Sequence, residues 1–182
     1  MTVVNFVRPI RIAVVAAIFG VLFAGACQAQ KLPLSYAPSS ALLAKGLVEV
    51  GPFTYDPAST GKVGPNQVRN TALGDVELDV PVAQYYREAL QQELRLTGVT
   101  LGGGNRVLTG EIKEFFIDDL GYSIDWTLDV RFMIKDKSGA VLYDAEKVVK
   151  NHTEKYLAPF NKQIRQSIEA LIADPAFISA IN

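Results

Sequence analysis

A chain of 182 residues, 49% of them hydrophobic, is long enough for one globular domain with its own core, which excludes a chain that is disordered throughout. Its formal net charge of −1, with both signs interspersed, gives no basic patch and excludes nucleic-acid binding. One cysteine and one histidine exclude an internal disulfide and a Cys/His zinc site, and no residue pattern predicts another metal site or a cofactor.

The beginning of the chain predicts a signal peptide over residues 1–26. Arg8 and Arg11 precede an apolar run over residues 12–24, and small residues follow it, which is the order of parts in a secretory signal. The apolar run is shorter than the roughly 20 residues that a membrane-spanning helix needs. We therefore expect an exported protein of a bacterial cell envelope, on its periplasmic side.

The end of this signal can be processed in two ways. Small residues directly before Cys27 resemble a bacterial lipoprotein signal, which implies that Cys27 carries lipid and anchors the protein to a membrane, with the outer membrane expected. Cleavage after Ala29 is the alternative, and it would leave a soluble periplasmic protein. The prolines and serines of residues 27–40 predict a tether, and residues 41–182 predict a single folded domain.

The first half of this domain predicts one strand and one helix. Leu47, Val48 and Val50 predict a strand that ends at Pro52. Residues 54–79, rich in Gly, Pro, Asn and Asp, hold either short strands, one around Val63 and one over residues 76–80, or a mobile functional loop. An amphipathic helix follows, capped by Asp79 or by the next residue and ending at Gly98.

The second half predicts three strands and a helix. Residues 124–134 alternate apolar and polar side chains, with Trp126 among the apolar ones, which is the pattern of a half-buried strand. Turns on either side join it to strands over residues 106–118 and from Val141, so the three should form an antiparallel meander. Consecutive apolar residues at 115–117 indicate a bulge or a strand covered on both sides. A second apolar stripe begins after Pro159, and Asp174 caps a short final turn.

These elements predict an α+β fold with the order β-α-β-β-β-α. The economical arrangement is a two-layer sandwich, in which a mainly antiparallel sheet carries two amphipathic helices on one face. The odd-numbered side chains of residues 124–134 would then face water or a partner. Asp125, Asp129 and Arg131 are the predicted partner surface.

Short motifs across residues 45–181 resemble a known family. They are GKVG, RNTALG, PVAQ, ALQQEL and TGV, at residues 61–64, 69–74, 81–84, 89–94 and 97–99. This pattern is similar to the YajG-type bacterial lipoproteins. The resemblance implies an envelope lipoprotein, and it carries over no catalytic residues.

The leading functional prediction is a non-catalytic envelope protein that acts through protein or lipid contacts in assembly, transport or maintenance, with an unidentified envelope protein as its partner. A domain that binds a small ligand or lipid between its helices and sheet, gated by residues 54–79, is the alternative. A hydrolase that uses His152 as a general base comes third, because no nucleophile motif accompanies this histidine.

Overall fold

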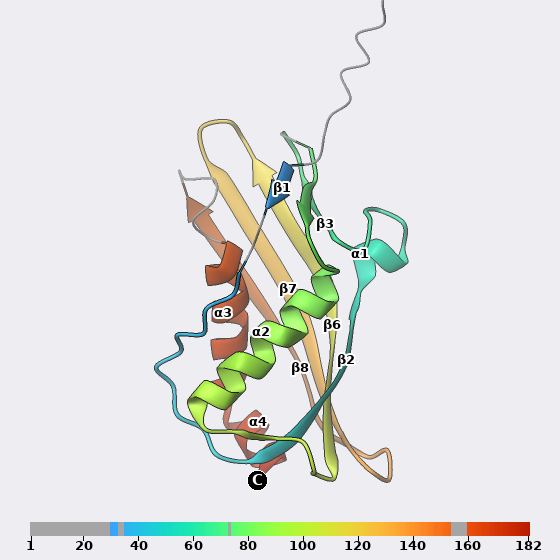
Figure 1. Cartoon of the computed structure of the whole chain (residues 1–182), viewed down its shortest axis with the longest axis vertical. Coiled ribbons are helices and arrows are strands. Elements are labelled where there is room, and N and C mark those ends of the chain that lie inside the picture. The colour runs from blue at the N-terminus through green and yellow to red at the C-terminus, as the bar shows by residue number, and fades with distance from the viewer. Residues whose placement is uncertain (1–29, 33–34, 73, 154–159) are drawn as a thin grey trace, which may run out of the picture.

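Three long strands form the largest part of the sheet (Figure 1). The computed structural model describes residues 30–32 by their backbone alone, and residues 35–72, 74–153 and 160–182. Strands β6 (Arg106–Asp119), β7 (Ile124–Asp136) and β8 (Val141–Thr153) pair antiparallel in that order, which confirms the predicted meander. The predicted signal peptide and Cys27 lie outside the described residues.

The rest of the sheet contains the main difference from the prediction. Strand β2 (Leu47–Tyr55) and strand β3 (Gln67–Asn70) both pair parallel with β6, and β4 (Val76–Leu78), β5 (Thr100–Leu101) and β1 (Gln30–Leu32) extend the edges. Four of the seven strand pairings are parallel, so the prediction of a mainly antiparallel sheet is wrong. The reason is that a helix lies between β2 and β6, and a crossover through a helix returns the chain in the same direction.

Three helices cover one face of this sheet. They are α2 (Val82–Thr97), α3 (Phe160–Ile172) and α4 (Pro175–Ile181), and Figure 1 shows them on the same side of β6, β7 and β8. Gly98 ends α2 with a φ of 102°, as predicted, but Pro81 occupies its N-cap position in place of the predicted cap. Asp174 accepts a hydrogen bond from the Ala176 N–H and so caps α4. No helix among the described residues is long and apolar enough to cross a membrane.

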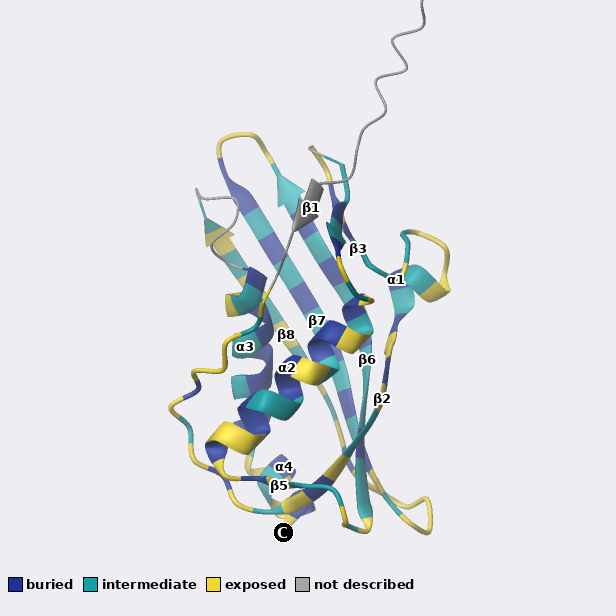
Figure 2. Cartoon of the chain, in the orientation of Figure 1, coloured by how far each residue is buried: buried dark blue, intermediate teal, exposed yellow. Residues whose placement is uncertain are grey.

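Alternation along the central strands builds the core between sheet and helices (Figure 2). Every even-numbered residue of β7 from Ile124 to Ile134 is buried, and Trp126 lies among aromatic rings of β6 and α3. Phe53 fills the space over Gly110, where an added Cβ would lie only 2.0 Å from its ring. This close approach of Phe53 to the backbone explains why β6 has a glycine at its midpoint.

Strand β6 contains the predicted bulge, although earlier than the apolar run suggested. Its register against β7 shifts between Ile112 and Glu114, which leaves Lys113 as the extra residue. Beyond the bulge the alternation is reversed, so that Phe115 is buried and Phe116 is not. Strict alternation counted from Leu108 and Ile112 would place Phe116 inward. In the structure its ring lies on the outside, with the Arg69 guanidinium 4.2 Å above its centre.

The segment from residue 54 to 79 is structured in its described part. It contains the end of β2, the short helix α1 (Asp56–Ser59), β3 and β4. Strand β4 confirms the strand predicted over residues 76–80. The strand predicted around Val63 is wrong, because Gly61, Gly64 and Pro65 place this stretch in turns, and β3 begins only at Gln67. The prediction ended the first strand at Pro52, whereas β2 continues beyond this residue to Tyr55. Its register against β6 shifts between Val50 and Phe53, so the pairing needs no backbone N–H from Pro52.

Residues 35–44 lie along α2 and α3, fastened by a buried carboxylate. Glu93 is fully buried, and it accepts hydrogen bonds from the Tyr36 hydroxyl (2.6 Å) and from the backbone N–H groups of Ser39 (3.1 Å) and Ser40 (3.0 Å). Asn161 of α3 donates to the Ser35 carbonyl at 2.9 Å. Burying an ionised carboxylate is costly unless it is hydrogen-bonded, and these three donors satisfy it.

Candidate functional site

The predicted partner surface lies on the sheet face that carries no helix among the described residues. Asp125, Asp129 and Arg131 project from β7 on this face, which we call the open face. Each pairs with side chains of the neighbouring strands β6 or β8. The structure therefore places the three predicted residues on one surface, within a network of cross-strand charges.

Arg131 connects three strands. Its Nε and Nη2 donate to the two carboxylate oxygens of Asp144 on β8, at 2.8 and 2.6 Å, and its Nη1 lies 3.9 Å from Glu111 on β6. A two-point contact of this kind fixes the orientation of the guanidinium as well as its position. The Arg131 guanidinium holds the pKa of Asp144 below its usual range.

Asp129 lies in the most unusual electrostatic position on the open face. Burial and the neighbouring Glu146 carboxylate raise the pKa of Asp129 to about 6. Lys113, the bulge residue of β6, forms an ion pair with Glu146, and this ion pair lowers the pKa of Glu146. Two carboxylates thus share one ammonium group, and the more buried Asp129 keeps its proton to a higher pH.

His152 is at the end of the open face. Its Nδ1 lies 2.7 Å from Oδ1 of Asp125, and both side chains are largely exposed. Such a pair provides the base and the orienting carboxylate of a hydrolase, but the structure gives His152 no serine or cysteine partner in its described part. Among the described residues, no three metal-binding side chains are grouped closely enough to hold an ion.

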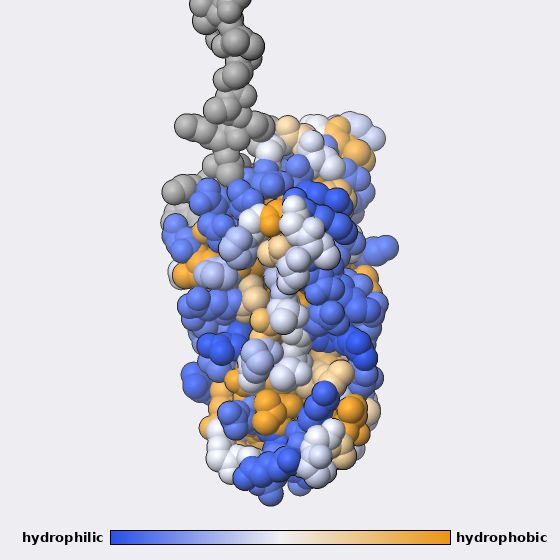
Figure 3. All heavy atoms as spheres, turned by 90° about the vertical axis from the view of Figure 1, so that its right-hand side faces the viewer, coloured by the Kyte–Doolittle hydropathy of each residue, from blue (hydrophilic) through white to orange (hydrophobic). Residues whose placement is uncertain are grey.

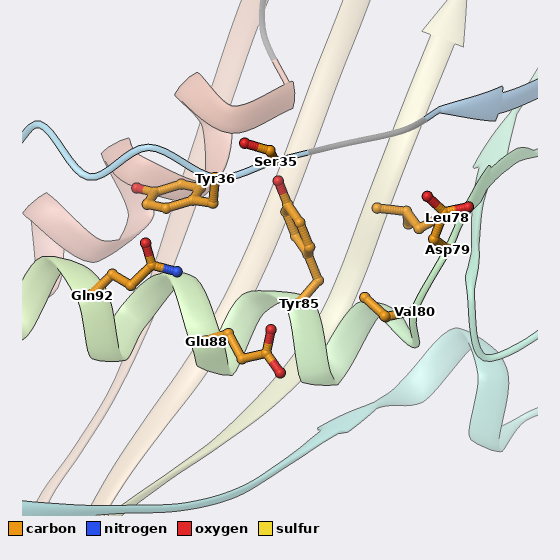
Figure 4. Close-up of a pocket in the computed structure, with 8 residues that line it drawn as sticks. All are labelled: Ser35, Tyr36, Leu78, Asp79, Val80, Tyr85, Glu88 and Gln92. Atoms are coloured by element: carbon orange, nitrogen blue, oxygen red, sulfur yellow. The ribbon is translucent and has the colours of Figure 1, made fainter.

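A pocket of about 270 Å³ lies beside α2 (Figure 4). Tyr36 of the N-terminal segment and Tyr85 of α2 form one wall, with ring centres 6.5 Å apart and ring planes at 83°. Leu78, Asp79 and Val80, at the end of the loop, form the other. The predicted ligand-binding alternative placed its pocket between the helices and the sheet. No residue of β6, β7 or β8 lines the pocket beside α2.

Parity along β7 and β8 was enough to find their outward-facing residues, but it did not predict which of them pair. Asp144 and Glu146 lie on β8, and Lys113 lies on β6. Their alternation with apolar residues was visible in the sequence. Matching each to its partner requires the strand register, which the bulge at Lys113 displaces. The pocket beside α2 gave no sequence signal, because its walls come from three separate segments.

Figure 3 shows the side of the molecule that carries α1 and β2 in Figure 1. This side is mostly hydrophilic, and many of its apolar residues lie toward the end where the C-terminus is. The open face contains a second hollow of about 290 Å³, lined by residues of β2, β6 and β7. Arg131 contributes to that hollow. The open face therefore offers both fixed charges and a shallow depression.

No family model matches this chain, and no curated protein matches it in sequence. The resemblance to YajG-type lipoproteins is therefore not confirmed by name. The fold is similar to protein XCC0632 from Xanthomonas campestris, described as DUF330, with a TM-score of 0.59 and 9% identity over 85% of this chain and 95% of that one. At this identity the likeness shows the fold alone.

Two further solved structures are more distant. Protein CT253 from Chlamydia trachomatis has a TM-score of 0.49 and 11% identity, over 74% of this chain and 99% of that one. A minor lipoprotein from Acinetobacter baumannii has a TM-score of 0.39 and 12% identity, over 63% of this chain and 94% of that one. At these TM-scores the two likenesses show no role for this chain.

Proposed function

We propose that this chain is a non-catalytic protein of the bacterial envelope that binds a partner protein through the open face of its sheet. The supporting observation is the contrast between the two faces of β7. Helices cover one face, whereas Asp125, Asp129 and Arg131 remain on the other with no described helix above them. Cross-strand pairs hold these charged side chains in place before binding. Few of them would therefore lose conformational freedom when a partner of complementary charge binds.

Photo-crosslinking in the cells that express the protein tests this contact. A photoreactive amino acid in place of Thr127, between the predicted contact residues, should capture an envelope protein. The Arg131→Glu variant should lower the yield several-fold, because it reverses the one positive charge among the three predicted contact residues. Lys137→Glu, in the exposed turn between β7 and β8, is the matched charge control and should leave the yield unchanged. Equal capture by all three proteins would contradict the proposal.

We further propose that lipid on Cys27 holds the protein at the outer membrane, on its periplasmic side. The support is the order of parts in residues 8–27. Cells fed radioactive palmitate should label the wild-type chain and not the Cys27→Ser variant. An unlabelled wild-type protein would instead indicate cleavage after Ala29 and a soluble periplasmic form.

A small-ligand function is the second candidate, and the pocket beside α2 supports it. Its volume of about 270 Å³ is near the lower end of the range for ligand sites, and two tyrosines and two acidic residues line it. Native mass spectrometry of the protein purified from cells should then show a bound small molecule that a Gln92→Trp variant loses, because the larger ring would fill the pocket. An identical mass for both preparations, apart from the substitution, would argue against it.

A further inference from the structure

Strand β8 forms one edge of the sheet. It is 13 residues long, and among the described residues it pairs with β7 alone. Figure 1 shows it on the side of the sheet away from β2, with α3 packed against its face. Every second residue of such a strand directs its backbone N–H and C=O away from β7, and an edge of this length can accept another strand.

The two faces of β8 differ in character. On the helix side, Lys147 and Tyr143 bond to Asp174, at 2.7 and 2.9 Å, and Asn151 bonds to Gln166 of α3. On the open face the exposed side chains alternate, and they are Asp144, Glu146, Val148, Lys150 and His152. Val148 is 52% exposed at the middle of this charged row, and no contact in the described part of the chain accounts for an apolar side chain there.

Geometry restricts how a second copy could pair at this edge. Two identical antiparallel strands are related by a two-fold axis perpendicular to the sheet. Two residues that lie opposite each other in an antiparallel pair have their side chains on the same side of the sheet. The two-fold axis must therefore pass midway between one residue of the strand and the same residue of the second copy. Each choice of central residue then fixes every facing pair along the strand.

The register centred on Val148 makes the edge complementary to itself. Val148 faces Val148 of the second copy, Glu146 faces Lys150, and Asp144 faces His152, with each unlike pair occurring twice. Registers centred on Glu146, Lys147 or Lys150 place like charges opposite one another. A centre at Val149 leaves Lys150 opposite Val148. Facing pairs of opposite charge stabilise a sheet and facing pairs of like charge destabilise it.

We propose that a second copy of this chain is the partner of the β8 edge, added antiparallel with Val148 on the two-fold axis. The two sheets then form one continuous sheet, with the helices of both copies on one side and both open faces on the other. Val148 is covered by its counterpart, which accounts for its exposure in the single chain. The pairing is independent of the partner protein proposed above.

Disulfide formation in the full-length chain tests the register. In a Cys27→Ser background, Val148→Cys places two thiols opposite each other at about the 5 Å Cα separation that a disulfide needs. It should give a covalent dimer on a non-reducing gel of envelope extracts. The control is Leu142→Cys, which is 43% exposed on the same strand. Its thiols would lie twelve residues apart along the paired strands, about 40 Å, and should not join. Absence of the dimer in Val148→Cys, or equal dimer in both variants, overturns the proposal.

Charge exchange tests complementarity with the same Val148→Cys reporter. Lys150→Glu should lower the dimer fraction several-fold, because Glu146 would then face a glutamate in the second copy. Adding Glu146→Lys to it should restore the dimer, since the facing charges are again opposite. Failure of the double variant to recover, in a protein whose circular dichroism is unchanged, overturns the register. Disulfide-linked adducts with other proteins in place of the dimer would show that a different partner occupies the edge, which also overturns it.

Discussion

The two faces of β7 are built from alternate residues of one strand, yet different forces hold their side chains. On the helix side the side chains are buried and apolar, so area removed from water stabilises them. On the open face Arg131 and its neighbours form ion pairs that stay partly exposed, and water weakens such pairs. The buried face therefore determines the stability of the fold, while residues of the open face can change with little cost and are available for binding.

The largest expected effect comes from adjacent residues on opposite faces. Phe132 is fully buried against the rings of Phe53 and Tyr86, so Phe132→Ala should lower the free energy of unfolding by about 3–5 kcal/mol. Arg131→Ala removes only partly exposed ion pairs and should lower it by less than about 1 kcal/mol. Urea denaturation of both variants measures the difference. Similar losses would show that the open face contributes to the core stability of the fold.

A second test concerns the buried carboxylate on the helix side. Glu93→Gln replaces one acceptor oxygen by an NH₂ group, which cannot accept from the Ser40 or Ser39 backbone N–H. We expect a loss of about 1–3 kcal/mol, with faster hydrogen exchange confined to residues 35–44. Glu88→Gln is the control, because Glu88 is exposed on the same helix. Unchanged exchange in residues 35–44 would mean that other contacts hold the segment.

Gln163 is an exception on the helix side that should respond in the opposite direction. It is fully buried in α3, and its Oε1 and Nε2 have no hydrogen-bond partner in the described part of the chain. Gln163→Leu keeps the size of the side chain and removes the unpaired amide, so it should raise the free energy of unfolding by about 1–2 kcal/mol. Gln166→Leu should give no gain, because the Gln166 amide is bonded to Asn151. Loss of stability in Gln163→Leu would indicate a bound water at the amide.

The difference between the faces also explains how much of the molecule could be predicted from its sequence. Alternation along residues 124–134 placed Trp126 inside and Arg131 outside, because side-chain direction in a strand depends only on local geometry. Gly98 and Asp174 marked helix ends for the same reason. Local signals of this kind act over a few residues, so they were sufficient for elements and faces.

Pairing between distant segments could not be predicted in the same way. The parallel contacts of β2 and β3 with β6 depend on the path of the chain through α2, and no short motif records that path. The charge pairs of the open face depend on register, and the single bulge residue Lys113 shifts it for half of β6. The candidate surface was therefore found by its residues, while its electrostatics required the structure.

The smallest expected effect concerns Asp129, a predicted contact residue whose ionisation the fold disfavours. The pKa of Asp129 is raised from 3.8 to about 6. The protonated carboxyl therefore contributes fully to the free energy of unfolding below pH 4, and this contribution is lost as pH rises through 6. Asp129→Asn cannot ionise and should not show this loss. The difference in unfolding free energy between variant and wild type should therefore shift in favour of the variant between pH 4 and pH 7, as measured by urea titration at each pH. A difference that is constant with pH would mean that water solvates the Asp129 carboxylate as it does an ordinary surface aspartate.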